Sequence, residues 1–151
     1  GGNLDIQEVC AGATLYLPVN VPGALLHVGD VHAIMGDGEI NGGGGIECRA
    51  LVTLSVELVA RPVRMGWPRI VNDTHIIAVG CARPGEDAFR TAVEQLVYWM
   101  ADSYGLAEPE AFMLLSQVLE ARATQYVDPL YTYVAKIKRS FLPDVTAMPW
   151  E

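Results

Sequence analysis

A short apolar run in the middle of the chain constrains the fold most strongly. Residues 74–79 read Thr-His-Ile-Ile-Ala-Val, so apolar side chains fall at both odd and even positions. Successive side chains of a strand point to opposite faces of its sheet, and a strand that is apolar on both faces has to be covered on both. The run therefore predicts a central strand buried between two layers.

Alternating patterns before this run predict further strands. Residues 14–21 and 24–28 each read as a strand, separated by a Pro-Gly turn, and Pro18 favours a sheet edge or a bulge for the first. The cleanest alternation occupies residues 50–59. We expect its apolar face to be buried core, and that face consists of Val52, Leu54, Val56 and Leu58.

Two amphipathic helices are predicted after Pro84. The first begins at Glu86 and Asp87 and ends at Gly105, and the second carries Pro109 in its first turn. Strands thus come first and helices afterwards. This order predicts an α+β fold, with a β-rich amino-terminal part (a sheet or a sandwich) followed by carboxy-terminal helices, in a single domain over residues 1–151.

Composition narrows the classes of partner. Hydrophobic residues make up 51% of the chain and mean hydropathy is +0.25, but no apolar run reaches the ~18–20 residues that span a bilayer. We therefore expect the surplus apolar surface to lie in a subunit interface rather than in a membrane. A formal net charge of −8 argues against nucleic-acid binding, which needs clustered Lys and Arg.

The three cysteines suggest a reducing compartment. They are odd in number and widely spaced, without a Cys-x-x-Cys pair, so neither a zinc knuckle nor a disulfide framework is indicated. The first residues also lack the charged-then-apolar pattern of a signal peptide. Reduced thiols in a cytoplasmic protein fit these observations best.

The segment at residues 29–46 differs in composition from its surroundings, because seven of the 15 glycines fall there among acidic residues and a histidine. If residues 30–32 are extended, Asp30 and His32 project to the same side, and Asp37 and Glu39 do likewise. A carboxylate and an imidazole in a glycine-lined loop are plausible ligands of a divalent metal. Taken alone this pattern is weakly selective, because glycine-rich loops with acidic residues are often ordinary turns.

Three motifs occur in a specific order. Residues 1–5 read Gly-Gly-Asn-Leu-Asp, residues 11–19 read Ala-Gly-Ala-Thr-Leu-Tyr-Leu-Pro-Val, and residues 29–39 read Gly-Asp-Val-His-Ala-Ile-Met-Gly-Asp-Gly-Glu. Their order and spacing resemble those of the acetamidase/formamidase family, in its carboxy-terminal half. Pro-Arg-Ile at residues 68–70 and the helical region 92–120 extend the resemblance over most of the chain.

The resemblance implies a metal-dependent hydrolase that converts small aliphatic amides such as formamide or acetamide to a carboxylate and ammonia. Carried over by residue, Asp30 and His32 are the first metal ligands, and Glu39 and then Asp5 come next. Zinc is the expected ion, with calcium as the alternative.

The resemblance also implies roles for three further side chains. Glu39 or Glu47 would move a proton from water to the departing nitrogen, and Asn3 would orient the substrate amide or a ligand. Glu47 is equally well explained as a solvated acid at the start of a strand.

The chain departs from the family pattern in two places and in length. The family usually has Gln where Met35 stands, and the Gly-Gly-Gly-Gly run at residues 42–45 is longer than expected. Its enzymes are about twice this length. We therefore expect an amino-terminal half, from a separate chain or from cleavage of a longer one, to supply further ligands. Self-association into a homo-oligomer would cover the same apolar surface.

Two other functions remain open from the sequence. A thiol amidase would use Cys10, Cys48 or Cys81 as its nucleophile, although none has an evident activating residue nearby in sequence. The other alternative is a non-catalytic or degenerate half-length relative that acts as an assembly module.

Overall fold

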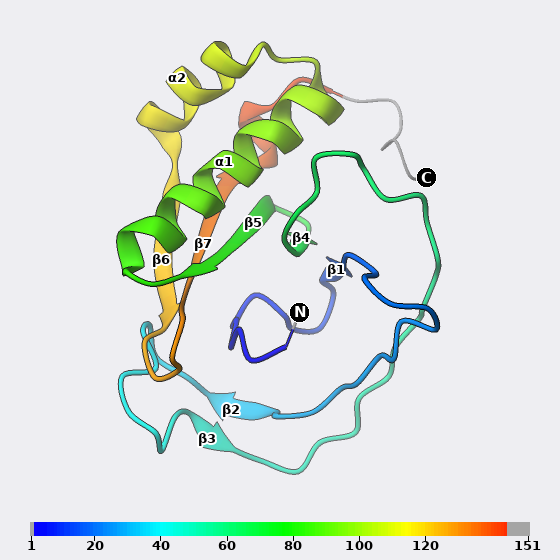
Figure 1. The fold of residues 1–151 in the computed structure, drawn as a ribbon, viewed down its shortest axis with the longest axis vertical. Coiled ribbons are helices and arrows are strands. Elements are labelled where there is room, and N and C mark those ends of the chain that lie inside the picture. The colour runs from blue at the N-terminus through cyan, green and yellow to red at the C-terminus, as the bar shows by residue number, and fades with distance from the viewer. Residues whose placement is uncertain (1, 145–151) are drawn as a thin grey trace.

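The computed structural model describes residues 2–144, which fold around one antiparallel five-stranded sheet (Figure 1). The strand order across the sheet is β1-β4-β5-β7-β6. The strands are β1 (Thr14–Tyr16), β4 (Arg69–Val71), β5 (His75–Ala82), β6 (Glu120–Gln125) and β7 (Tyr131–Lys138). A separate two-stranded ribbon pairs β2 (His32–Ile34) with β3 (Ile46–Glu47).

The predicted central strand is confirmed as β5. It lies between β4 and β7, and six of its eight residues are buried. Ile76 and Ala78 face the helices, whereas Ile77 and Val79 face the opposite side, where Leu4 packs against them with other residues of the amino-terminal segment. The sheet therefore has a layer on each face, as the apolar run requires.

Helix α1 (Gly85–Tyr104) covers one face of the sheet and ends at Gly105, which has φ 68°. This end is the left-handed cap that glycine adopts most easily. Close approach of α1 to the sheet depends on Gly80 in β5, since a Cβ there would collide with the backbone of Ala88 and Ala92. The predicted first helix is thus confirmed, and one glycine sets how closely it packs.

Helix α2 (Glu108–Val118) is also confirmed, with Pro109 in its first turn. The Glu110 carboxylate accepts a hydrogen bond from the Ala107 backbone N–H at 3.0 Å, which satisfies a free donor at the helix start. The helix buries Ala111 and Leu115, but Phe112 is 61% exposed. Its apolar stripe is therefore only partly covered by the described residues. Neither α1 nor α2 is long and apolar enough to cross a membrane.

The α+β class is confirmed, but the order of elements is not strands first and helices last. Strands β6 and β7 follow the helices and complete the sheet, and a short 3-10 helix η1 (Arg139–Phe141) follows them. These strands were missed because charged and polar residues interrupt their apolar positions. Lys136 on β7 and Glu120 on β6 are directly paired across the two strands. Their opposite charges compensate each other, so these polar residues are compatible with strands and do not indicate a loop.

The expected strands at residues 50–59 and 24–28 are absent from the structure, and β1 is much shorter than residues 14–21. Residues 50–59 form no strand, and Leu54 and Leu58 are 55% and 84% exposed. An alternating segment becomes a strand only when a neighbour supplies backbone hydrogen bonds and covers its apolar face. Nothing in residues 2–144 does so, and the expectation that this face is buried core is wrong for this structure.

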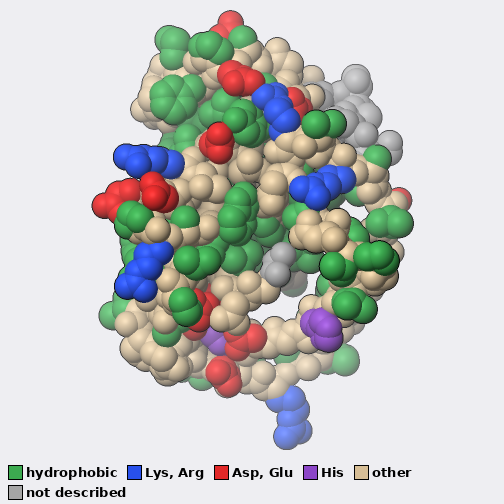
Figure 2. All heavy atoms as spheres, viewed as in Figure 1, with side chains coloured by type: hydrophobic (Ala, Val, Ile, Leu, Met, Phe, Trp, Pro, Cys, Tyr) green, Lys and Arg blue, Asp and Glu red, His purple; other side chains and the backbone are tan. Residues whose placement is uncertain are grey.

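The segments before β2 and after β3 instead run as two long arms away from the sheet (Figure 1). The space-filling view shows an opening between these arms and the body of the molecule, with apolar side chains along the arm (Figure 2). The β2–β3 ribbon joins the two arms at the end that lies farthest from β1 and β4. It also brings residues 30–47 back beneath the β6–β7 end of the sheet.

Two leucines test this assignment of core and surface. Leu96 of α1 is fully buried, so Leu96→Ala is expected to lower the free energy of unfolding by about 2–5 kcal/mol. Leu54→Ala removes the same atoms from an exposed position and is expected to change it by less than about 0.5 kcal/mol. Urea unfolding followed by circular dichroism measures both. A large loss in the Leu54 variant would restore the buried-strand expectation.

Candidate functional site

The β2–β3 ribbon brings together three polar side chains. His32 and Glu47 are directly paired across the ribbon, so their side chains lie on the same face. Asp30 lies two residues before His32, and its Oδ1 is 3.2 Å from His32 Nε2. One ligand atom from each of Asp30, His32 and Glu47 falls within 4.8 Å of the others. Among residues 2–144 this triplet is the one such group with the geometry to hold a metal ion.

The glycine run before β3 makes room for these side chains. A Cβ on Gly45 would lie 2.7 Å from His32 Nδ1 and would also strike the Ile34 carbonyl oxygen. Gly44 has φ 56°, and a Cβ there would strike Glu39 Oε1. The long glycine run is therefore explained by close approach of the backbone to two site side chains. It is not a phosphate-binding loop.

Glu39 is the buried acid of the site. It is 8% exposed, its Oε1 lies 3.9 Å from His32 Nδ1, and its Oε2 has no hydrogen-bond partner in the described structure. Burying a carboxylate oxygen without a donor is costly. A carboxylate with one oxygen near a histidine and the other without a partner fits a site that is completed by a cation, a water or a substrate N–H.

Met35 lies against the same ring nitrogen of His32 as Glu39, opposite the nitrogen that contacts Asp30. Its Sδ is 3.3 Å from His32 Nδ1, in the position where the family pattern led us to expect Gln. The thioether is a weak hydrogen-bond acceptor, so it orients the imidazole less firmly than an amide oxygen would.

Asp5 and Asn3 converge on an acid that the sequence did not reveal. Asp128 lies in the turn between β6 and β7, and its Oδ2 accepts a 2.7 Å hydrogen bond from Asn3 Nδ2. Burial raises the pKa of Asp5 to about 6, and the neighbouring charge of Glu39, a hydrogen bond with Asp128 and the charges of Asp128 and Asp30 add to the effect. This carboxyl group therefore titrates closer to neutrality than an ordinary aspartate.

Arg122 of β6 ties the two site segments to the sheet. Its guanidinium donates to Asp37 Oδ1 at 2.6 Å and to Glu8 Oε2 at 2.7 Å, and also to Gln7 Oε1 at 3.1 Å. Lys136 Nζ of β7 lies 3.3 Å from the other oxygen of Glu8. Glu8 follows Asp5 by three residues, and Asp37 precedes Glu39 by two. One arginine thus positions both segments.

Backbone hydrogen bonds hold the Glu39 segment at the same place. The Gly38 N–H donates to the Ala123 carbonyl at 3.0 Å, and the Tyr126 N–H donates to the Gly38 carbonyl at 2.6 Å. Both partners belong to the β6–β7 end of the sheet. The loop after β2 is therefore docked on regular structure rather than suspended in solvent.

Four site residues have a left-handed backbone. Asn3, Asp5, Asp30 and Glu39 have φ values of 50°, 45°, 59° and 34°. Non-glycine residues adopt positive φ infrequently, and such strain persists where surrounding contacts enforce it, often at functional sites. Its concentration on four of the six candidate residues supports a shaped site. Figure 2 shows acidic and histidine side chains gathered at this end of the molecule.

The six predicted residues thus fall into two neighbouring groups. Asp30, His32 and Glu47 form the triplet, with Glu39 against His32. Asp5 and Asn3 lie with Asp128, outside the triplet. Sequence reasoning missed Asp128 and Arg122, because each is joined to its partners only by long-range folding.

The thiols show no comparable arrangement. Cys10 and Cys48 are exposed, and Cys81 is buried in β5. Burial raises the pKa of the Cys81 thiol, which disfavours the reactive thiolate. The structure therefore gives no support to Cys81 as a nucleophile.

Several known proteins are similar to this chain. The model of the Acetamidase/Formamidase family matches residues 1–137. The acetamidase of Mycolicibacterium smegmatis is 44% identical over 59 residues, which are 39% of this chain and 14% of that protein. The formamidase of Methylophilus methylotrophus is 39% identical over 64 residues, 42% of this chain and 16% of that protein.

A solved structure extends the match to nearly the whole chain. The acetamidase from Yersinia enterocolitica superposes with a TM-score of 0.82 and 37% sequence identity. The match covers 95% of this chain but only 43% of that one. The chain therefore spans less than half the length of this relative.

The anchoring role of Arg122 can be tested by hydrogen exchange. Arg122→Gln is expected to speed hydrogen exchange of the Gly38 and Tyr126 amides, because the loop that contains Gly38 loses its anchor on the sheet. Charge-assisted hydrogen bonds contribute about 1.5–3 kcal/mol each, and those of Arg122 are partly exposed. Arg90→Gln is the matched control, because Arg90 is an exposed helical arginine paired with Asp87. Unchanged exchange at Gly38 in the Arg122 variant would show that the backbone bonds suffice.

Proposed function

This chain belongs to the Acetamidase/Formamidase family, and we propose on that basis that it carries much of the active site of a hydrolase acting on small aliphatic amides. The reaction would convert formamide or acetamide to the carboxylate and ammonia. The observation that carries the proposal is the convergence of Asp30, His32 and Glu47 within the segment that the family model matches. A non-catalytic assembly module is the alternative, and the retained polar cluster does not favour it.

The donor set fits a divalent metal, with zinc as the proposed ion. Two carboxylates and one imidazole provide oxygen and nitrogen ligands, and three protein ligands with one open position is the usual number for catalytic zinc. Asp30, His32 and Glu47 would hold the ion, so Glu47 takes the third ligand role, for which the resemblance suggested Glu39 and then Asp5. The buried Glu39 carboxylate, with Oε1 3.9 Å from His32 Nδ1 and Oε2 unpartnered in the described chain, supports a positive charge at this place.

When bound, such an ion would supply positive charge that polarises the amide carbonyl and acidifies water. The protein side chains have separate tasks. Glu39 would accept a proton at Oε2 and return it to the departing nitrogen; the support for this role is that Oε2 is buried and has no hydrogen-bond partner in the described chain. Its position behind the glycine run excludes bulk water from one side of that carboxylate.

Asn3 and Asp128 have a positioning task in this proposal. The Asn3 side-chain Nδ2 already donates to Asp128, so the side-chain oxygen of Asn3 is left to accept a hydrogen bond from a substrate N–H. Asp5, beside Asp128 and Glu39, is a reservoir for a proton near neutral pH. Asn3 and Asp5 both lie on the strained amino-terminal segment that Arg122 holds to the sheet.

The proposed enzyme needs a second half. The two long arms extend away from the sheet, and many of their apolar side chains are exposed. The Yersinia enterocolitica relative has more than twice the chain length matched here. We propose that a complementary half, from the same or another chain, covers the arms and completes the pocket. A homo-oligomer would serve only if its interface lies over the Asp30–Glu47 triplet.

Metal binding is tested by elemental analysis of purified variants. His32→Ala is expected to lower bound zinc from about one ion per chain to near none, because one of three ligands is lost. His27→Ala is the control, since His27 is exposed and outside the triplet. The fold of both variants is checked by circular dichroism. Full zinc content in the His32 variant would refute the assignment.

Amide hydrolysis is tested by ammonia release from acetamide and formamide. The isolated chain is expected to be inactive, and activity is expected when it is combined with the complementary half. In that assembly, Glu39→Gln is expected to lower kcat on the order of 10²-fold or more while zinc content is retained. Glu94→Gln, at an exposed position on α1 away from the triplet and the arms, is the matched control. Robust turnover by the isolated monomer would contradict the need for a second half.

A further inference from the structure

A buried arginine lies far from the proposed active site, at the other side of the sheet. Arg69 of β4 is 1% exposed, and its side chain crosses the edge of the helix-facing core. The guanidinium carbon lies 5.0 Å above the centre of the Trp99 ring of α1. A cation over an aromatic face is favourable, but it does not satisfy the N–H donors of the guanidinium.

All three guanidinium nitrogens of Arg69 lack a hydrogen-bond acceptor within the described part of the chain. Burial lowers the pKa of Arg69 to about 10, with Asp102 opposing the shift and Arg64 adding to it. The side chain is therefore still charged at neutral pH. An ionised, fully buried guanidinium with no acceptor is among the most costly arrangements in a protein interior.

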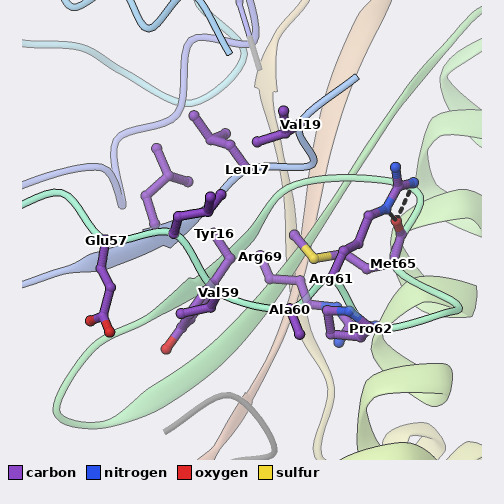
Figure 3. A pocket seen from close by; sticks show the side chains of 12 residues that line it. Tyr16, Leu17, Val19, Glu57, Val59, Ala60, Arg61, Pro62, Met65 and Arg69 are labelled. Atoms are coloured by element: carbon purple, nitrogen blue, oxygen red, sulfur yellow. Dashed lines mark hydrogen bonds between the residues drawn. The ribbon is translucent and has the colours of Figure 1, made fainter. Parts of the chain in front are cut away.

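A cavity of about 150 Å³ lies beside this side chain (Figure 3). Its walls come from β1 and the following residues, from residues 57–62 and from Met65. Most of the lining is apolar. A second arginine, Arg61, is already engaged, since its guanidinium donates to the Met65 carbonyl oxygen at 2.7 and 3.0 Å.

The one acidic lining residue does not neutralise Arg69. Glu57 is exposed, and it makes no hydrogen bond with the guanidinium. The wall formed by residues 57–62 belongs to no helix or strand. It can therefore move aside without breaking a ladder of backbone hydrogen bonds.

We propose that the cavity beside Arg69 is a binding site for a carboxylate carried on a short apolar stem. Two parallel N–H donors of a guanidinium match the two oxygens of a carboxylate. The apolar walls formed by Leu15, Leu17, Val19 and Met65 match a short aliphatic chain. A free phosphate or chloride ion would satisfy the charge but would leave these walls in contact with water.

Two sources can supply this chemical group. One is a free short-chain acid, which is also the class of product that the proposed amide hydrolysis would release. The other is an Asp or Glu side chain of the complementary half. The site itself rests on Arg69 and its cavity, so loss of the proposed amidase activity would leave the following binding test unaffected.

The test is a titration of the chain with sodium acetate and sodium butyrate, against sodium chloride at matched ionic strength. The nitrogen–proton signals of Arg69 Nε and Trp99 Nε1 are followed by NMR. Butyrate is expected to produce a saturable shift at millimolar concentration and acetate a weaker one, whereas chloride produces none. A butyrate response no larger than that of chloride overturns the proposal.

Variants separate specific binding from general charge effects. Arg69→Gln is expected to abolish the saturable Trp99 shift, and Arg69→Lys, which keeps the charge, to weaken it several-fold. Arg90→Gln makes the same charge change at an exposed site and should leave it intact. If Arg69→Gln fails to fold, the Lys variant decides the matter. A full response in a folded Arg69→Gln or Arg69→Lys protein overturns the proposal.

The same titration on the chain combined with its complementary half distinguishes the two sources. A persisting butyrate shift identifies a free acid as the ligand. An Arg69 signal already at the carboxylate-bound position, and unresponsive to butyrate, identifies an acidic side chain of the other half. A signal that is neither displaced nor responsive overturns the site.

Discussion

The cluster of charges around Arg122 is the interaction on which the candidate site depends. Glu8 is 9% exposed and is contacted by both Arg122 and Lys136, so a carboxylate that would be costly to bury alone is compensated from two neighbouring strands. Arg122 also holds Asp37. Two loops that are separate in sequence are thereby fixed to one end of one sheet. The site residues Asp5 and Glu39, which lie close to Glu8 and Asp37 in these loops, are held there with them.

This anchor works because the sheet beneath it is rigid. Strand β5 is buried on both faces, and β7 pairs with it along all eight of its residues. The close contact of α1 at Gly80 leaves little freedom for the two layers to slide. Arg122, Ala123 and Asp128 lie at or beyond the outer β6–β7 edge of this unit, so they present fixed partners to Asp37, Gly38 and Asn3.

Two features of residues 2–144 lack a covering or compensating partner within the described chain. The arms before β2 and after β3 carry exposed leucines and valines, and Arg69 is a buried cation without an acceptor in the described chain. Both features lie on the β1–β4 side of the sheet and on the arms. The proposed complementary half would account for both features, because the fold of the Yersinia enterocolitica relative extends well beyond the part that matches this chain.

Elements whose signals are local could be predicted from the amino-acid sequence. The doubly apolar run became β5, both amphipathic patterns became helices, and Asp30 and His32 fell side by side because their two-residue spacing is short-range. Which alternating segment gained a partner strand depended on long-range packing, since periodicity describes a face but not what covers it. It also recruited Asp128 and Arg122, which contact their partners across 125 and 85 residues of sequence, distances over which no local pattern carries information.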